Sequence, residues 1–291
     1  MASTFSVTVL GSGGPFADKH RVSSGYLLSI RGKPRMLVDC GGGTFERIGQ
    51  AGLDLSGLEQ VLLTHLHIDH TSDLPAVIMH LYMSDRGRAL TVTGPRGRPG
   101  NTDAPENAAP QLGVSEFVRL LFGVEGAWRY MNTFDGFAIN ATDVASVASG
   151  AVVQSVHVDP ALIAEGISID ACGVPHGMMP TLAFRINYRG RSVVFSGDTS
   201  GATPALLALA SQCSMLVHDF ALPEREVPSG KLHAKPSVVG WIANESGTKS
   251  LLLSHFMPAI EPELDTAVDI VRRAYTGKIE LAEDLSTYEV G

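Results

Sequence analysis

The stretch of sequence that decides the fold is His65-Leu66-His67-Ile68-Asp69-His70. It follows an apolar run at residues 60–64 that is typical of a buried strand, and it precedes a helical pattern. Imidazole and carboxylate groups are ligands that zinc and similar metals prefer. A turn at a strand end can aim the first two histidines at one point, and the aspartate and the third histidine at a second point nearby. We therefore expect a metal site here; the alternative is a set of surface histidines that cap the helix.

Strand-like and helix-like patterns alternate on both sides of this motif. The apolar, β-rich runs lie at residues 5–10, 25–30, 35–38, 60–64, 89–93, 167–171, 181–188, 191–196, 214–218 and 250–254. Helical patterns lie at residues 74–81, after the N-cap Thr203 and Pro204, after Pro236, and at residues 261–276. This alternation predicts an α/β protein with a mixed sheet or sheets.

Three later segments place ligand-type residues at the edges of predicted strands. They are Gly173-Val174-Pro175-His176, Ser196-Gly197-Asp198-Thr199 and Leu252-Leu253-Ser254-His255-Phe256, and an earlier turn reads Val38-Asp39-Cys40-Gly41-Gly42-Gly43. Each is a weak signal alone, because turn histidines and Asx-turn aspartates are common. In this order, and together with the six-residue motif, they resemble the signature of the metallo-β-lactamase-fold hydrolases. The resemblance spans about residues 5–260 and implies a four-layer αβ/βα sandwich with mixed sheets.

The resemblance also implies a set of ligands for two metal ions. The ligands are His65, His67 and His176 for the first ion, Asp69, His70 and His255 for the second, and Asp198 as the bridge between them. A bridging carboxylate favours a di-metal centre, because two divalent cations need nearby negative charge. Such a pair can share an attacking hydroxide, and zinc-bound water is acidic enough to supply one near neutral pH. We expect two Zn²⁺ ions, with Mn²⁺ or iron as alternatives because such sites accept several metals.

Within this family, the sequence is most similar to the ribonuclease Z-like branch, which also includes small-molecule phosphodiesterases and zinc arylsulfatases. Leu10-Gly11-Ser12-Gly13-Gly14-Pro15 resembles the opening glycine turn of this branch, and Lys231-Leu232-His233-Ala234-Lys235 resembles its histidine loop. The resemblance implies that His233 faces the metals and assists the leaving group or the developing oxyanion. We expect Asp69 and His233 to be catalytic. The alternative is that His233 is an exposed loop histidine and that the two lysines are merely solvated.

The interval between the third histidine and the bridging aspartate departs from ribonuclease Z, which carries a long flexible arm there and grips tRNA with it. Here Asp198 follows His176 by only 22 residues, enough for two strands and a turn. The extra length is an inserted loop and helix at about residues 94–135 of a single domain that we expect over residues 1–291. It begins with a Pro/Gly-rich stretch, and its large apolar residues are Phe117, Leu121, Phe122, Trp128 and Tyr130. A lid, a wall for an organic group and a packed satellite helix all stay open.

Several functions are compatible with these motifs. Our leading hypothesis is a di-zinc hydrolase of a small anionic ester, either a phosphodiester or an aryl sulfate, that uses a metal-bridging hydroxide. A first alternative is tRNA 3′-end processing, which the missing arm disfavours. A second is a lactonase or thioesterase, since a bridging hydroxide also attacks carbonyls. A third is a non-enzymatic metal-binding protein, which would be expected to have lost a ligand.

Composition narrows the partners and the location. A hydrophobic content of 44% and a charged content of 18% exclude a disordered chain, and no apolar run approaches the ~18 residues of a membrane span. The net charge of −8 argues against broad binding of nucleic acid. We expect a small anionic ester as the partner, no membrane and no nucleic acid, and we leave a homodimer open. Scattered cysteines and the lack of a signal-peptide pattern favour the cytoplasm, or a secreted or periplasmic location if a signal peptide has been removed.

Overall fold

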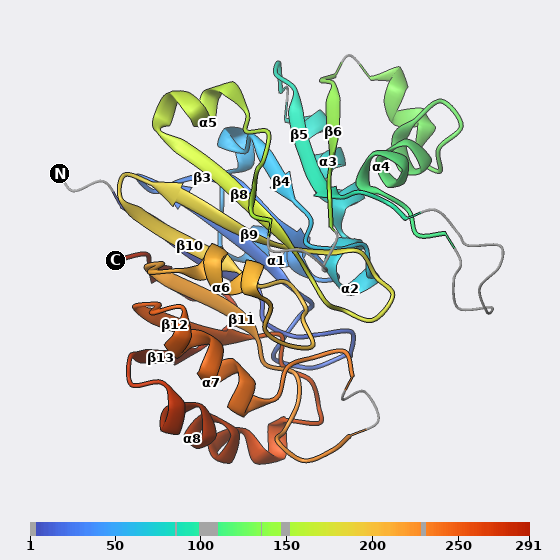
Figure 1. Cartoon of the computed structure of the whole chain (residues 1–291). Coiled ribbons are helices and arrows are strands. Elements are labelled where there is room, and N and C mark those ends of the chain that lie inside the picture. The colour runs from blue at the N-terminus through green and yellow to red at the C-terminus, as the bar shows by residue number, and fades with distance from the viewer. Residues whose placement is uncertain (1–3, 85, 99–109, 135, 147–151, 228–230) are drawn as a thin grey trace.

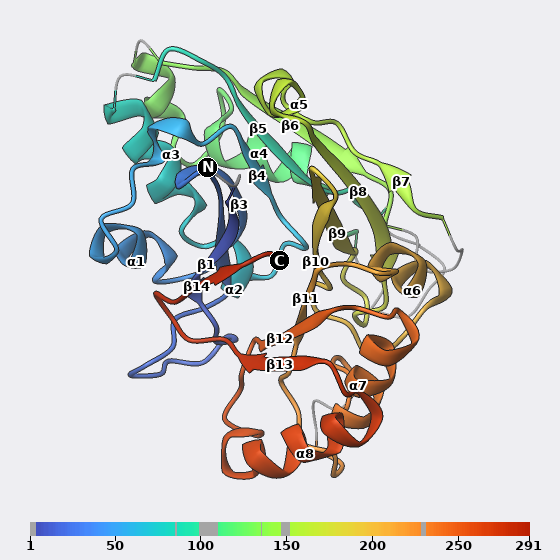
Figure 2. The same cartoon turned by 90° about the vertical axis from the view of Figure 1, so that its left-hand side faces the viewer.

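Two seven-stranded mixed sheets pack face to face, and helices cover the outer face of each (Figure 1, Figure 2). The computed structural model describes residues 4–84, 86–98, 110–134, 136–146, 152–227 and 231–291. One large apolar cluster fills the space between the sheets and the outer layer of the second sheet, and a second cluster lies under the helices of the first sheet. The predicted four-layer sandwich is confirmed.

The first sheet has the strand order β14-β1-β2-β3-β4-β5-β6. Its strands are β1 (Phe5–Gly11), β2 (Gly25–Ile30), β3 (Lys33–Cys40), β4 (Gln60–Leu62), β5 (Leu90–Pro95), β6 (Ile139–Val144) and β14 (Thr287–Glu289). Strands β1 to β3 form an antiparallel meander, and β3 to β6 run parallel. Because parallel strands end at the same edge, the segments that follow β3 and β4 meet there.

The second sheet has the order β13-β12-β11-β10-β9-β8-β7. Its strands are β7 (Gln154–Ser155), β8 (Ile167–Val174), β9 (Thr181–Tyr188), β10 (Arg191–Phe195), β11 (Met215–Asp219), β12 (Ser250–Ser254) and β13 (Lys278–Leu281). Strands β10 to β13 are parallel, and β8 is separated from β10 by the antiparallel β9. The ends of β8, β10, β11 and β12 therefore lie at one edge of the sheet.

The helices bury their apolar faces on the outside of the two sheets. Beside the first sheet lie α1 (Thr44–Gln50), η1 (Leu55–Gly57), α2 (Ile68–Thr71), α3 (Leu74–Met83), α4 (Val114–Phe122) and η2 (Arg129–Thr133); beside the second lie α5 (Pro160–Glu165), α6 (Pro204–Ala210), α7 (Pro236–Glu245), η3 (Glu261–Glu263) and α8 (Leu264–Ala274). The Thr203 side chain accepts the N–H of Leu206, so the predicted N-cap of α6 is confirmed. Among the described residues, none of the helices is long and apolar enough to cross a membrane.

The sequence patterns did not predict the short strands at the edges of the two sheets. β6, β7, β13 and β14 were not predicted; they have two to six residues, and β6 and β13 are only half-buried along most of their length, so their apolar pattern is weak. The last helix was expected from residue 261, but α8 begins at Leu264 because a 3₁₀ turn that contains Pro262 precedes it. The central strands β2, β9 and β12 have the predicted bounds.

The inserted segment packs on the first sheet. α4 lies against β5 and β6, and Phe122 is 5% exposed. Phe117, Leu121 and Trp128 are half-buried against the same apolar cluster, whereas Tyr130 is half-exposed. Residues 99–109 of the predicted Pro/Gly-rich loop lie outside the described residues. Phe117, Phe122 and Trp128 therefore act as packing elements, which is the alternative that the structure favours.

Candidate metal centre

The first half of the chain contributes its ligand-type residues from one turn. β4 leads into this turn, where His65 is buried, and the short helix α2 then carries Asp69 and His70. The adjacent glycine turn after β3 makes this packing possible. A Cβ at Gly41 would collide with the backbone oxygen of Asp69. Glycine is required there because the two turns touch through their backbones.

The second half contributes one residue from each of three strand ends. His176 follows β8, Asp198 follows β10 and His255 follows β12. Gly197 has a φ of 60°, and a Cβ there would lie 2.7 Å from the backbone oxygen of Leu182. His255 itself has a φ of 59°, a left-handed conformation that non-glycine residues seldom adopt. Such strain is retained where it aims a functional side chain.

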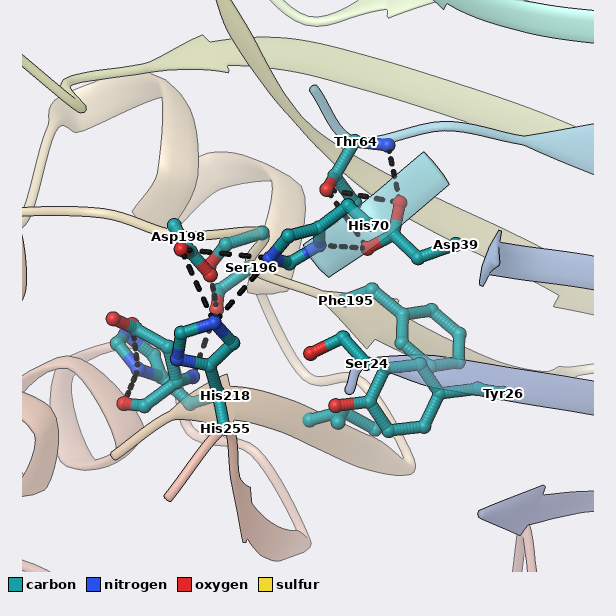
Figure 3. A pocket seen from close by; sticks show the side chains of 13 residues that line it. Ser24, Tyr26, Asp39, Thr64, His70, Phe195, Ser196, Asp198, His218 and His255 are labelled. Carbon is teal, nitrogen blue, oxygen red and sulfur yellow. Dashed lines mark hydrogen bonds and ion pairs between the residues drawn. The ribbon is translucent and has the colours of Figure 1, made fainter. Parts of the chain in front are cut away.

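The structure brings all seven predicted ligands together. The grouped ligand atoms of His65, His67, His176 and Asp198 lie within 4.8 Å of one another, and so do those of Asp69, His70 and His255. Asp198 joins the two groups through a single oxygen. Its Oδ2 lies 3.4 to 3.8 Å from the Nε2 atoms of His65, His70, His176 and His255 (Figure 3 labels three of the residues involved). This is the position that a bridging carboxylate must occupy.

Other buried groups hold the rings of the ligand histidines. Asp39 accepts the backbone N–H of Thr64 at 2.7 Å, and its other oxygen lies 2.8 Å from Nδ1 of His70 (Figure 3). Nδ1 of His176 donates to the backbone oxygen of Leu232 at 2.9 Å. In both rings, Nε2 is therefore left to face the cluster. Partners of this kind fix the tautomer and the orientation of metal-binding histidines.

The ionisation of the cluster suits divalent cations. Burial lowers the pKa of His65, His67 and His176, so these imidazoles are neutral and keep a lone pair for a metal. Burial alone would raise the pKa of Asp198, but the nearby His255 and His70 hold it well below its usual value. Neutral imidazoles around ionised carboxylates are the donor set of a transition-metal site.

His70 differs from His65, His67 and His176 in the direction of its pKa shift. Burial alone would lower its pKa, but the carboxylates of Asp198 and Asp39 raise it well above the usual value in the chain without cations. In the absence of cations, a proton on His70 thus balances part of the negative charge of these carboxylates, which bound cations would neutralise. The residues present therefore fit two divalent cations, and the cluster is of the binuclear kind that is typical of this fold.

His233 lies beside the cluster and not in a solvent-exposed loop. It is 6% exposed, and its ring stacks on that of His255 with centroids 5.3 Å apart. Its Nδ1 lies 2.8 Å from Oδ2 of Asp219, the last residue of β11. Asp198, His233 and His255 could also be grouped as ligands, but the contact with Asp219 already occupies Nδ1 of His233. Burial alone would lower the pKa of His233, and the hydrogen bond to Asp219 raises it.

The analysis of the sequence missed Asp219. The only available signal was its position directly after His218, the last residue of the strand predicted at residues 214–218. His218 is buried, and its Nδ1 lies 3.0 Å from Oδ1 of Asp219 and 2.9 Å from the backbone oxygen of that residue. Burial alone would raise the pKa of Asp219, and its hydrogen bonds with the two histidines lower it. Asp219 is therefore the charged partner of His233.

The remaining predicted residues lie around this centre. Gly14 packs against His255, since a Cβ there would lie 3.0 Å from the histidine ring. Lys235 forms an ion pair with Glu226, and Lys231 is exposed. The other histidines of the chain, His20, His80 and His157, are exposed and lie in none of the clusters of ligand-type residues found among the described residues.

Comparison with known proteins agrees with this geometry. A family model described as Anti-Pycsar protein Apyc1 matches residues 5–95. A protein named Ribonuclease Z from Mycobacterium avium is 29% identical over 297 residues, which cover 98% of each chain. The structure of human tRNase Z, short form, has a TM-score of 0.73 against this chain and 20% sequence identity, over 98% of this chain and 99% of its own.

Two further solved structures have the same architecture. The metallo-beta-lactamase fold protein YhfI from Bacillus subtilis has a TM-score of 0.70 and 20% identity, over 98% of this chain and 99% of its own. A diphosphatase from the PhnP family has a TM-score of 0.65 and 18% identity, over 98% of this chain and 97% of its own. The chain therefore has the metallo-β-lactamase fold, and the predicted resemblance to its ribonuclease Z-like branch is confirmed.

Proposed function

We propose that this protein is a di-metal phosphodiesterase, with tRNA 3′-end processing as the first candidate activity. The observation that carries the proposal is the position of Asp198 Oδ2 between the two groups of histidines, with the His233–Asp219 pair at their side. Two adjacent divalent cations are the recurrent device for in-line displacement at phosphorus. The similarity to ribonuclease Z over nearly the whole chain supports RNA as the substrate.

The proposed metal ligands divide between the two halves of the cluster. They are His65, His67 and His176 for one ion, Asp69, His70 and His255 for the other, and Asp198 for both. When bound, two cations would lower the pKa of a shared water and stabilise the charge on the transferring phosphoryl group. Nitrogen and oxygen donors suit Zn²⁺, and Mn²⁺ and iron are alternatives. Asp69 has two oxygens, so one of them is available to accept a proton from the attacking water.

His233 is the proposed general acid. Since Nδ1 points at Asp219, only Nε2 is free to reach a substrate. The raised pKa of the ring favours the protonated form near neutral pH. Nε2 can therefore give a proton to the leaving oxygen, and Asp219 orients the ring and stabilises its positive charge. The His233–Asp219 pair would thus assist departure of the leaving group, and the metal ligands would serve to activate the attacking water.

The arguments against nucleic acid are weaker than the sequence indicated. The turn between β9 and β10 is short, as predicted, and it leaves no room for an arm. However, the alignment with ribonuclease Z of M. avium covers 98% of both chains, so neither chain carries a long segment that the other lacks. The missing arm therefore does not separate this chain from that relative. The net charge of −8 is the argument that remains for a small phosphodiester or diphosphate as the second candidate.

A turnover panel with metal-loaded protein tests these candidates. The substrates are a pre-tRNA with a 3′ trailer, bis-p-nitrophenyl phosphate, p-nitrophenyl sulfate and a lactone. Position-specific cleavage at the tRNA 3′ end supports the first candidate, and cleavage of the small phosphodiester without pre-tRNA cleavage supports the second. Hydrolysis of neither phosphodiester would contradict both. None of the relatives named above is a sulfatase, so we expect no turnover of the sulfate. Chelator-treated protein and Asp269→Ala, which changes an exposed aspartate of α8, serve as controls.

A further inference from the structure

A cavity opens beside the proposed metal centre. It has a volume of about 250 Å³ and lies between the loop that follows β1 and the segment that follows β12. These two segments are joined by a β-bridge between Gly13 and Phe256. Gly14 lines the cavity and also packs on the His255 ring, so the cavity adjoins a proposed ligand.

The walls of this cavity are flat and mostly apolar. Phe16 lines it with a ring that is 51% exposed, and Met257 and Pro258 line it from the other segment. The Arg21 guanidinium lies over the Phe256 ring, 4.1 Å from its centroid. An exposed aromatic ring and a stacked guanidinium are the groups on which nucleobases stack.

Besides the Arg21 guanidinium, the charged side chains of the cavity are the carboxylates of Asp18 and Glu261. Glu261 is half-exposed, and its Oε1 lies 3.5 Å from Nε of Arg21. Asp18 uses Oδ1 to accept the N–H groups of His20 and Arg21, which leaves Oδ2 available. Two carboxylates disfavour a phosphate in this cavity, but they accept hydrogen bonds from an exocyclic amino group, such as those of adenine and cytosine.

The cavity is formed before any ligand binds. Oδ1 of Asp284 accepts the N–H of Ser12 at 2.9 Å, and Oδ2 accepts the N–H of Val22 at 2.9 Å. Nη1 of Arg21 donates to Oγ of Ser12 at 2.7 Å and to the backbone oxygen of Ala282 at 2.8 Å. The guanidinium is thus fixed as a wall and is not free to reach out to a phosphate. A preformed wall lowers the entropy cost of binding a planar group.

We propose that this cavity binds an amino-bearing nucleobase of the nucleotide next to the scissile phosphate. The volume is below the range of about 300–1,000 Å³ that is usual for sites of drug-sized ligands, so it suits one ring system and not a whole nucleotide. The contact of Gly14 with His255 leaves the phosphate of the same nucleotide within reach of the metal centre. This inference deepens the proposed phosphodiesterase function and rests on it.

Binding to the metal-loaded full-length chain tests the proposal without turnover. Isothermal titration calorimetry compares adenosine 5′-monophosphate with ribose 5-phosphate, which lacks the base, and with inosine 5′-monophosphate, which has an oxo group in place of the amino group. We expect the adenosine ligand to bind about tenfold more tightly than ribose 5-phosphate, as is usual for stacking on an aromatic side chain. Phe16→Ala should remove most of this difference. Glu261→Ala should remove the preference for adenosine over inosine monophosphate.

The matched control is Leu120→Ala, which truncates an exposed apolar side chain of α4 that does not line this cavity. It should leave all three affinities unchanged. Equal affinities for adenosine monophosphate and ribose 5-phosphate in the unmodified protein would overturn the proposal, and so would a difference that survives Phe16→Ala. A base-dependent affinity in a protein that hydrolyses no phosphodiester would instead contradict the proposed function and leave the cavity's assignment intact.

Discussion

The two halves of the molecule build the candidate centre in different ways. The first half supplies four ligand-type residues from six consecutive positions after β4, whereas the second supplies His176, Asp198 and His255 from three separate strand ends. The first set is held by one turn and its glycine neighbour. The second depends on the parallel alignment of β8, β10 and β12, because only the sheet brings those ends together. A local motif can thus be recognised in the sequence alone, and a dispersed one only by its order.

The largest effect is expected from Asp198, the residue of the second half that touches both groups. Asp198→Ala removes the oxygen that we propose as the metal bridge, so we expect phosphodiesterase activity below detection and fewer than two metal ions per chain. Metal analysis of purified protein and turnover of bis-p-nitrophenyl phosphate measure this. Asp269→Ala is the control. Two bound ions and full activity in Asp198→Ala would contradict the proposed bridging role of this residue.

His233 tests whether the second half also supplies the general acid. His233→Ala should lower kcat by about 10²–10⁴-fold with both metals retained. The loss should be smaller for esters of p-nitrophenol, because a good leaving group needs less protonation. Asp219→Asn should show the same dependence on the leaving group with a smaller loss, since it acts through the ring. Loss of a metal ion from His233→Ala would make His233 a ligand, and an unchanged kcat on poor leaving groups would exclude it from catalysis.

Phe122 tests whether the inserted segment of the first half serves packing and not the site. Phe122→Ala should lower the free energy of unfolding by about 3 kcal/mol, because a buried aromatic ring is replaced by a cavity. The kcat of the folded protein should stay within about twofold of its original value. Chemical denaturation and turnover measure the two effects. Val124→Ala, at an 87% exposed position, is the control. A large fall in kcat without a loss of stability would show that the segment acts as a lid.

The smallest effect is expected from alkylation of the cysteines, which occur in both halves of the chain. Burial raises the pKa of Cys40 and Cys213, and that of Cys172 to about 12, so near pH 8 the three thiols stay protonated. We expect no alkylation by iodoacetamide in the folded protein and three alkylated sites after unfolding in guanidinium, counted by mass spectrometry. Labelling of Cys172 or Cys213 alone would show that the second half opens more readily than the first.

The limits of prediction from the sequence follow the same division. The contiguous motif, and the order of His176, Asp198 and His255 after it, predicted a cluster that the structure brings together. Asp219 could not be found in this way, because its role depends on the pairing of β11 with β10 and on a loop that returns fourteen residues later with His233. The left-handed conformations of Asp39 and His255 were not predicted either, because only a minority of aspartates and histidines adopt a positive φ. Edge strands such as β14 gain their pairing from β1, so their own residues carry little signal.

The pairing of β14 with β1 has a consequence for the order of events during synthesis. Ser6, Val7 and Thr8 pair with Glu289, Tyr288 and Thr287, so the outer edge of β1 stays unpaired until β14 has been synthesised. Asp284, from the segment just before β14, holds the loop after β1 that flanks the metal centre. Contacts this distant in sequence form slowly, because their loop-closure entropy must be overcome first. The nascent chain therefore emerges with its cluster of histidines on an unfinished sheet, and the loop beside them becomes fixed only after residue 284 has left the ribosome.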